Sequence, residues 1–395
     1  MSKKIKIGLT FRLLIAIALG IIIGKWMPAP FCRIFITAGG IVSSFLSFVI
    51  PLVILAFVTL GIANLSTGAG LLLVITAGLS YFSSLVSGTA AFITAENLFP
   101  SFISDSFVSG LDAESGMLAP FFKVPIPPVI SVIGAVALAF ILGLCISAQR
   151  ARNSDNTLYK VVNEFSEAIS GVLRVAVIPL LPLLICGTFV NMTVSGQTFS
   201  ILNMLWKVFL TVIILHFIYM FVLFCIAAAV GKRNPFKMMR NQISGYMTAI
   251  GTQSSAATIP VNLKCAEANG VSNEIRNFTI PLCANIHMAG SMITITSCVT
   301  AVLLMNNMPV GLHIIVPFIL TLGVAMIASP GAPGGSIMTA LPFLPIVGIP
   351  QDGAIASLLI ALYITQDSFG TACNVSGDNA LSVIVDTIYS KYIKK

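Results

Sequence analysis

The amino-acid sequence predicts an all-α membrane protein, and three properties of the chain support that prediction. Hydrophobic residues make up 57% of the 395 residues and charged residues only 9%, whereas soluble domains carry about 25% charged residues. The mean hydropathy of +1.01 indicates that apolar residues run along the whole chain instead of filling a single core. Many apolar stretches also reach the roughly 20 residues that a helix needs to span a bilayer.

Six such segments fill the first part of the chain, and each is interpreted as a spanning helix. They cover about residues 8–27, 35–64, 69–95, 125–149, 160–193 and 198–230. The first follows Lys3, Lys4 and Lys6, as the apolar part of a signal peptide would, but no small-residue cleavage site comes after it. Because the segment is also long enough to span, we expect a transmembrane helix there.

Charges in the connecting loops predict the orientation. Basic residues collect before the first segment, between the fourth and fifth, after the sixth and at the end of the chain. The loop after the third segment instead carries Glu96, Asp105, Asp112 and Glu114 against Lys123. Because positively charged loops stay in the cytoplasm, we expect both termini to be cytoplasmic, in a bacterial inner membrane.

Composition also excludes several function classes. The net charge of +8 comes from 21 Lys and Arg residues that form no basic stripe, so nucleic acid is not an expected partner. The eight cysteines contain no CxxC pair, which indicates core residues and not disulfides or a metal site. Without a phosphate-binding loop, a dinucleotide fingerprint or a zinc motif, we expect no organic cofactor and an ion gradient as the energy source.

After residue 240, two clusters of small and polar residues interrupt the apolar sequence, at 251–260 and 328–336. Glycine and proline leave backbone groups that hydrocarbon cannot satisfy, so such sequence must be buried in protein or line a wet cavity. The short flanking stretches favour two re-entrant hairpins over surface loops. A third break, Asn285–Ser291, contains His287, whereas His216 and His313 are interpreted as core residues.

The last long segment, 354–389, carries a polar stripe. Asp367, Thr371, Asn374 and Asp378 lie at positions i, i+4, i+7 and i+11, which a helix places on one face. Buried charges in membranes are costly and usually functional, and oxygen-bearing side chains suit an ammonium group or a hard cation. The alternative is a stripe that only holds helices together by hydrogen bonds. Asp386 is a third acidic residue of this segment expected to lie deep in the membrane.

An enzyme would need the two aspartates of the stripe to act together, as in an intramembrane aspartyl protease. Eleven residues of helix separate Asp367 from Asp378, or about 16 Å, which is too far for a shared proton. A transporter is therefore favoured over an enzyme, while a passive channel or a receptor stays open on these residues alone.

Taken in order, the motifs resemble the dicarboxylate/amino acid:cation symporters, the family of the glutamate transporters. The resemblance covers essentially the whole chain, and it rests on the Ser-Ser-Ala-Ala-Thr sequence at 254–258, the break at 287–291, the Pro/Gly-rich cluster, the sequence Phe-Thr-Ile-Pro at 278–281 and the stripe from Asp367 to Asp378. It implies a homotrimer that works as an elevator, with eight transmembrane helices and two re-entrant helical hairpins in each chain.

The resemblance also implies a division into two parts. The scaffold would comprise 1–68 (helices 1 and 2) and 125–197 (helices 4 and 5). The transport domain would comprise 69–124 (helix 3 and the external loop) and 198–395. Its elements would be helix 6, hairpin 1 at about 235–263, helix 7 at about 272–306, hairpin 2 at about 309–349 and helix 8 at about 351–390.

Matched position by position, the resemblance implies a binding site for an amino acid and one for a cation. Asp367 would hold the amino group and Thr371 other polar atoms, while Asn374 would bind the carboxylate together with Ser254 and Ser255. The backbone of Ser329, Pro330 and Gly331 would close over the ligand. The cation site would comprise Cys283, Asn285, His287, Asn374 and Asp378.

Two departures from the family pattern predict the substrate. Gly370 stands where members that carry acidic substrates have an arginine, and Gln253 stands where some members place an alternative arginine. A second carboxylate on the substrate would therefore be buried without a partner. We expect a small neutral amino acid; the alternative is an acidic amino acid or dicarboxylate.

Further departures concern the coupling ion. Ala289 replaces an aspartate that coordinates sodium in the family, and His287 replaces an asparagine with a nitrogen donor that hard cations favour less. Met326 stands where members place a threonine near another ion. Asn374 and Asp378 persist, which favours Na+ over H+, although a histidine could take up a proton.

Overall fold

The computed structural model describes residues 9–64, 70–101, 103, 118–152, 155–196, 198–327, 329, 334–351 and 353–393. Every regular element in these ranges is a helix. The elements are α1 (Leu9–Trp26), α2 (Ala29–Asn64), α3 (Gly70–Leu98), η1 (Phe99–Ser101), α5 (Val132–Arg152), α6 (Thr157–Val172), η2 (Leu173–Val177), α7 (Ile178–Val194), α8 (Thr198–Gly231), α9 (Pro235–Thr252), α10 (Ser255–Ala268), α11 (Asn273–Ile286), α12 (Ala289–Met305), α13 (Leu312–Met326), α14 (Gly335–Ala340), η3 (Leu341–Val347), α15 (Gly353–Ile388) and η4 (Tyr389–Ile393).

Several of these helices are long and apolar enough to cross a membrane. Five stretches of the described chain meet that condition: Ala29–Phe57, Leu71–Ser101, Thr157–Val194, Leu205–Gly231 and Asn273–Met305. Large apolar side chains on the outer helices point away from the protein, among them Val74, Phe82 and Val175. Such exposure suits a surface that contacts lipid.

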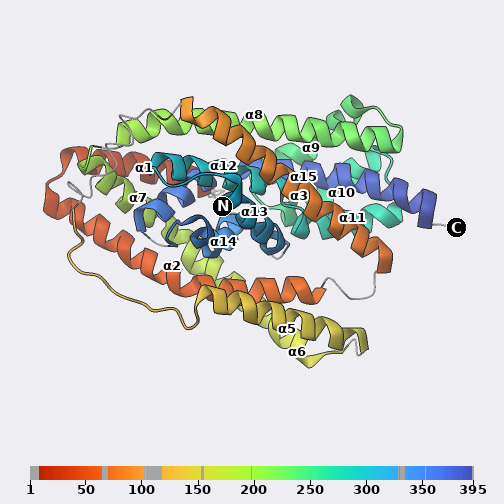
Figure 1. The fold of residues 1–395 in the computed structure, drawn as a ribbon, viewed down its shortest axis with the longest axis horizontal. Coiled ribbons are helices and arrows are strands. Elements are labelled where there is room, and N and C mark those ends of the chain that lie inside the picture. The colour runs from red at the N-terminus through yellow and green to blue at the C-terminus, as the bar shows by residue number, and fades with distance from the viewer. Residues whose placement is uncertain are drawn as a thin grey trace, which may run out of the picture.

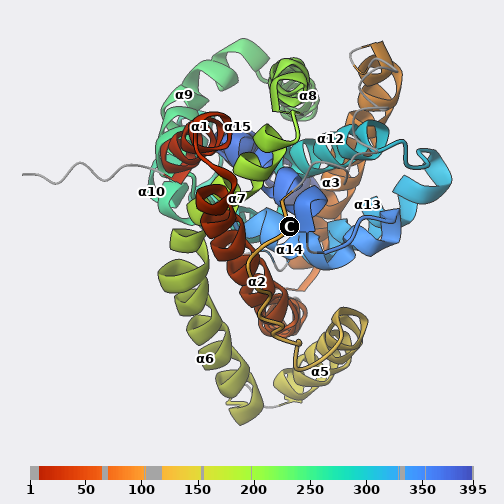
Figure 2. The ribbon, with the colours of Figure 1, turned by 90° about the vertical axis from the view of Figure 1, so that its left-hand side faces the viewer.

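The helices pack as two groups. In the first, α1 packs on α7, and α2 packs on α5, α6 and α7. In the second, α12 and α15 form the centre, with α3, α8, α9 and α11 packed around them. In Figure 1, α8 runs along one edge and α5 and α6 along the opposite edge, with α12, α14 and α15 between them. Figure 2 shows α5 and α6 standing out from the rest of the molecule.

A glycine sets the close contact inside the first group. A Cβ atom at Gly187 of α7 would lie 2.5 Å from the carbonyl oxygen of Phe35 in α2. Because no side chain fits at that distance, glycine is required where the two helices touch. The resulting pair, α2 and α7, forms one wall of a cavity described below.

The break predicted near His287 is confirmed, and it is short. Helix α11 ends at Ile286 and α12 begins at Ala289, so only His287 and Met288 interrupt the helical backbone. Around the break, His287, Met288 and Ala289 are each no more than 2% exposed. Backbone groups released by the break therefore face protein and not lipid, which is the condition for irregular backbone at membrane depth.

The first interrupted region, 251–260, forms a turn between the helices α9 and α10. Gln253 ends α9 in the left-handed conformation, with φ of 54°, and the Ser254 side chain caps α10 by accepting from the amide of Ala257. A left-handed residue followed by a serine cap stops one helix and starts the next. The two helices then pack against each other, as a hairpin requires.

Carboxamide side chains fasten this helix pair to α15. Gln242 of α9 donates to Asn262 of α10 (3.0 Å) and accepts from Asn379 of α15 (2.6 Å). Asn379 in turn accepts from Asn269 (2.9 Å). All four carboxamides are at least 95% buried. Because each carboxamide both donates and accepts, the network satisfies buried polar groups without any charge.

The second interrupted region, 328–336, lies between α13 and α14. The structure describes only Ser329 and residues from Gly334 onward there, so Pro330 and Gly331 of the predicted ligand-covering backbone fall outside the described residues. The lysines at 3, 4, 6, 394 and 395 and the acidic residues Asp105, Asp112 and Glu114 also fall outside them. The orientation derived from these charges stays a prediction.

Candidate functional site

The polar stripe predicted for the last long segment lies on α15. Asp367, Thr371, Asn374 and Asp378 are each no more than 5% exposed. The stripe faces α12, the break at 287–288 and the start of α14, as its hydrogen bonds show below. It therefore lies in the centre of the second group of helices and makes no direct contact with lipid.

Among the described residues, Asp367 accepts hydrogen bonds only from neutral groups. The backbone N–H of Gly334, just before α14, donates to its Oδ2 at 2.7 Å. The Tyr363 hydroxyl donates to its Oδ1 at 2.9 Å. Thr371, one turn further along α15, faces the same carboxylate. A buried carboxylate surrounded by neutral donors is a strong acceptor for a positively charged group.

Tyr363 is a site residue that the sequence analysis missed. Besides contacting Asp367, its hydroxyl lies 3.2 Å from Oγ of Ser291 in α12. Ser336 of α14 donates to the same Ser291 Oγ at 3.1 Å. The position of Tyr363, one turn before Asp367 on the stripe face, is the signal that could have identified it. Ser291 joins α12, α14 and α15 beside the Asp367 carboxylate.

Asn374 caps the first turn of α12. Its Oδ1 accepts from the backbone N–H groups of Gly290 (2.7 Å) and Ser291 (3.2 Å). Its Nδ2 donates to Ser291 Oγ at 3.0 Å. A side-chain oxygen at this position satisfies N–H groups that the break leaves without partners. The carboxamide thus holds the broken helix against α15.

Asp378 contacts the predicted histidine. Nδ1 of His287 lies 3.0 Å from Oδ1 of Asp378, and the two side chains are 0% and 1% exposed. Nε2 of His287 lies 2.8 Å from Oγ of Ser83 in α3, which lies 2.6 Å from the Tyr219 hydroxyl in α8. Both nitrogens of the imidazole ring therefore have partners, one on α15 and one on α3, and α8 contacts the ring's partner Ser83.

The pairing at Asp378 restricts the state of the ring. An ionised carboxylate only accepts, so Nδ1 carries a proton whenever Asp378 is charged. Nε2 then either accepts from the Ser83 hydroxyl or, in the imidazolium form, donates to it. The enclosure can accommodate both forms by rotation of one hydroxyl.

His216, interpreted from sequence as a core residue, packs against the broken helix. Its Nε2 lies 3.0 Å from the Gly290 carbonyl and 3.1 Å from Thr294 Oγ1. Its Nδ1 is buried with no hydrogen-bond partner among the described residues. The side chain thus supports the first turn of α12 from the α8 side, a role that a lone histidine in an apolar segment does not reveal.

Gly370 lies at the closest approach of α12 and α15. A Cβ at Gly290 would lie 2.3 Å from the carbonyl oxygen of Gly370, and a Cβ at Gly370 would lie 3.3 Å from Thr294 Oγ1. Gln253, at the tip of the α9–α10 pair, donates from Nε2 to Ser368 of α15 at 2.8 Å. Among the described residues, no arginine or lysine hydrogen-bonds or pairs with the carboxylates of the stripe.

Three predicted residues lie away from this group or are used differently. Asn285 is exposed and donates to the Pro281 carbonyl of its own helix at 2.9 Å, so the structure does not bring it to Asp378. Cys283 is buried, with its sulfur 3.7 Å from Ser80 Oγ. Asp386 pairs with Arg233 (3.4 Å) and accepts from Ser272 Oγ (2.6 Å), which makes it a structural link and not part of the stripe.

The predicted serines lie at the start of α10. Ser254 is half-buried at the cap position, and Ser255 is 4% exposed in the first turn. Ser329, also buried, lies 3.5 Å from Ser336 through their hydroxyls. Serines therefore lie at the turn between α9 and α10 and in the segment between α13 and α14.

Comparison with known proteins places the chain among transporters. Residues 9–388 match the sodium:dicarboxylate symporter family. The chain is 28% identical over 411 residues to the serine/threonine transporter SstT of Acinetobacter baylyi, covering 98% of each chain. It is 28% identical over 298 residues to human neutral amino acid transporter B(0), covering 72% of this chain and 53% of that protein.

Human excitatory amino acid transporter 3 is also similar, at 27% identity over 271 residues, which cover 67% of this chain and 50% of that protein. The chain thus spans about half the length of these human relatives.

Proposed function

The chain belongs to the sodium:dicarboxylate symporter family, and we propose that it imports a small neutral amino acid together with a cation. Family membership makes it a multi-pass membrane protein and a cation-coupled amino acid or dicarboxylate symporter with the glutamate-transporter fold, not an enzyme. The identity of the amino acid and of the cation is the subject of the proposal.

The observation that carries the proposal is the environment of Asp367. This carboxylate is buried, and its hydrogen-bond partners among the described residues are neutral. A substrate ammonium group supplies the positive charge that it lacks. Among the described residues, no arginine or lysine hydrogen-bonds or pairs with the carboxylates of the stripe, so a zwitterion with a neutral side chain fits the charge of the site.

The Gly334 N–H bond to Asp367 indicates how binding could be linked to closure. The backbone N–H of Gly334, just before α14, hydrogen-bonds to one oxygen of the Asp367 carboxylate, to which the substrate ammonium group would bind. We propose that the ammonium replaces this bond, and that the α13–α14 pair then closes over the ligand with the backbone near Ser329, Pro330 and Gly331. Ser254, Ser255 and Asn374 would hold the carboxylate of the substrate.

The proposal extends to the assembly. Eight transmembrane helices and two re-entrant hairpins, with both termini in the cytoplasm, agree with the positive loops of the sequence. The scaffold would comprise 1–68 and 125–197, and the moving part 69–124 and 198–395. The two groups of packed helices support this division, because α1, α2, α5, α6 and α7 pack mainly on one another. A homotrimer follows from the resemblance.

Na+ is the first candidate for the coupling ion. Asp378 and Asn374 supply the hard oxygen donors that Na+ selects. In the structure, however, Asn374 Oδ1 accepts two backbone N–H groups and Asp378 Oδ1 contacts His287. Na+ binding there would require these contacts to open.

H+ is the second candidate, and the His287–Asp378 contact favours it. The imidazole fills the space beside the carboxylate, and its nitrogens contact Asp378 and Ser83. Histidine is the side chain whose charge changes most readily near neutral pH. A proton carried by the His287–Asp378 pair would take the place of the Na+ that a site lined with oxygen donors would bind.

One experiment tests both parts. Purified protein in liposomes is supplied with labelled serine, alanine or aspartate under an inward Na+ gradient, an inward H+ gradient or neither. Accumulation of serine or alanine supports the substrate proposal, and preferential accumulation of aspartate overturns it. Dependence on Na+ at fixed pH selects the first ion, and accumulation with the H+ gradient alone selects the second.

A further inference from the structure

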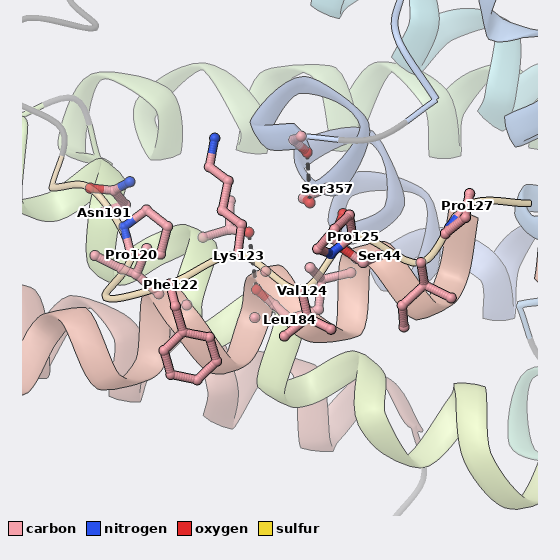
Figure 3. A pocket seen from close by; sticks show the side chains of 18 of the residues that line it. Ser44, Pro120, Phe122, Lys123, Val124, Pro125, Pro127, Leu184, Asn191 and Ser357 are labelled. Atoms are coloured by element: carbon pink, nitrogen blue, oxygen red, sulfur yellow. Dashed lines mark hydrogen bonds between the residues drawn. The ribbon is translucent and has the colours of Figure 1, made fainter. Parts of the chain in front are cut away.

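A cavity of about 620 Å³ lies away from the stripe, between α2, α7, the first turn of α15 and the segment 118–131. Figure 3 shows it from close by, with the extended segment crossing in front of the helices. None of the residues assigned to the amino acid or the cation lines it. Its size falls in the range of ligand sites, which is about 300–1,000 Å³.

The segment 118–131 is fastened to both helices of the cavity wall. The amide of Leu118 donates to Asn191 of α7 (2.8 Å), and the amide of Phe121 donates to Thr37 of α2 (2.8 Å). Arg33 donates to the Ala119 carbonyl (2.9 Å) and lies over the Phe121 ring at 4.3 Å. These contacts give the cavity a fixed outer wall.

The next part of this wall is stiff. Residues 124–128 read Val-Pro-Ile-Pro-Pro, and proline fixes the backbone in an extended form without N–H donors. The segment therefore presents prolines and apolar side chains to the cavity and no row of amides.

Among the residues that the structure describes, Lys123 is the one charged residue that lines the cavity. In the part of the chain that the structure describes, no carboxylate pairs with its ammonium group. In Figure 3 the Lys123 side chain extends away from the segment, with its nitrogen apart from the other labelled side chains. The cavity walls are thus mostly apolar, with a single positive charge and the polar side chains of Ser43, Ser44, Thr188, Asn191 and Ser357.

The α2 side of the cavity is open at Gly40. A Cβ atom built there would meet no atom within 4 Å. The segment beside the cavity exposes large apolar side chains, with Phe122 59% and Val129 75% exposed. The cavity therefore continues into an apolar surface of a membrane protein, which lipid acyl chains surround.

We propose that this cavity binds an anionic lipid of the surrounding bilayer. The headgroup contacts Lys123, and an acyl chain lies against α2 and α7 over Gly40 and Leu184. A positive charge attracts an anionic headgroup, and apolar walls receive the chain. A water-soluble anion would gain no binding free energy from these apolar walls, whereas a lipid acyl chain would.

The lipid would also bridge the two groups of helices, because Gly353 and Ser357 of α15 line the same cavity as α2 and α7. If the groups move past one another during transport, the bound lipid changes the transport rate. This second part rests on the proposed function, whereas binding itself does not.

Lipid retention by the full-length protein tests the binding. Native mass spectrometry compares phosphatidylglycerol with phosphatidylcholine of the same acyl chains, added to delipidated protein. We expect phosphatidylglycerol to be retained more strongly by the wild type. Lys123→Gln should lower its apparent affinity about fivefold, the contribution of one lysine near anionic lipid.

Two further variants sharpen the assignment. Gly40→Leu fills the open space and should abolish retention of the bound lipid, and Lys25→Gln, at the end of α1 outside the cavity, should leave it unchanged. Equal retention of both lipids by the wild type, or unchanged retention in Lys123→Gln and Gly40→Leu, overturns the proposal. If Lys123→Gln instead loses the oligomer, the cavity face would be assigned to contact with a second copy of the chain, and the lipid proposal would be overturned.

Transport in liposomes separates this inference from the proposed function. Lipid retention that follows the variants in a protein that accumulates no amino acid overturns the proposed function alone. Normal accumulation with no lipid preference overturns the lipid site alone.

Discussion

The two aspartates of α15 share one face of one helix, yet their surroundings differ in kind. Asp367 receives a backbone amide from the start of α14 and a phenol from its own helix. Asp378 faces an imidazole that is itself held by Ser83 of α3. Among the described residues, the first carboxylate has only neutral partners, and the second already has a partner that can carry a positive charge.

This difference shows that position on a stripe does not assign a role. The partner at Asp367 is the backbone N–H of Gly334, just before α14, and we propose that the substrate replaces it. The partner at Asp378 comes from the break between α11 and α12 and is fully buried. A replaceable partner suits a ligand site, and an enclosed imidazole suits an ion-coupling site.

The largest expected effect comes from removing each charge in turn. Asp367→Asn should reduce both accumulation and substrate exchange about 100-fold or more, because the ammonium group loses its buried counter-charge. Asp378→Asn should retain exchange between equal substrate concentrations and lose accumulation driven by the ion gradient. Both are measured in liposomes with labelled substrate.

Equal loss of exchange in the two variants would remove the distinction between the carboxylates. Thermal unfolding in detergent checks that both variants are folded.

Replacing the imidazole sharpens the Asp378 side of the comparison. His287→Gln places a carboxamide oxygen beside Asp378, and we expect the apparent affinity for Na+ in uptake assays to rise about tenfold, a typical effect of changing a group next to a metal ligand. His313→Gln, at an exposed histidine of α13, is the control and should show no change. An unaltered Na+ response in His287→Gln would mean that the ring does not occupy the ion's position.

A smaller effect is expected from Tyr363→Phe, which tests the Asp367 side. The variant loses hydrogen bonds to Asp367 and Ser291, and we expect KM to rise about five- to tenfold, which corresponds to the roughly 1–1.4 kcal/mol net contribution of an ordinary hydrogen bond. The dependence on the driving ion should not change. Tyr389→Phe removes a hydrogen bond from Tyr389, just beyond the end of α15, to Glu274. This control variant should leave KM unaltered.

A shift of the ion dependence in Tyr363→Phe would show that the two carboxylates do not act separately.

The smallest effect on transport is expected from the carboxamide network. Gln242→Leu leaves Asn262 and Asn379 with unsatisfied groups, which should lower the free energy of unfolding by about 2 kcal/mol. KM should stay the same, because the network contacts neither carboxylate. Thermal unfolding with parallel uptake assays measures both, with Asn163→Ala on the exposed face of α6 as the control. A raised KM at normal stability would move the network into the binding site.

Much of this arrangement follows from simple periodicity and composition. The 3.6-residue repeat places Asp367 and Asp378 on one face, and the polar break near His287 interrupts the helix where the sequence predicts. Both features depend on local sequence, because helix geometry and backbone hydrogen bonding are local.

Other features depend on contacts between distant segments and could not be predicted in this way. Tyr363 looks like an apolar residue of its helix until Ser291, 72 residues away, meets its hydroxyl. His216 resembles any core histidine until α12 brings Gly290 to it. Asn285, which the resemblance implies for the cation site, is exposed on α11 and donates to the Pro281 carbonyl of its own helix.

The close contact of Gly290 and Gly370 also restricts how such a chain could evolve toward acidic substrates. An arginine at 370 is one amino-acid replacement away, but its Cβ would lie 3.3 Å from Thr294 Oγ1. Whether that neighbour can give way decides if the replacement is tolerated. A smaller residue at 294 relieves the crowding, and that change by itself introduces no charge. Where Thr294 cannot give way, the order of mutations is directional: a permissive change on α12 comes first, and the arginine on α15 second.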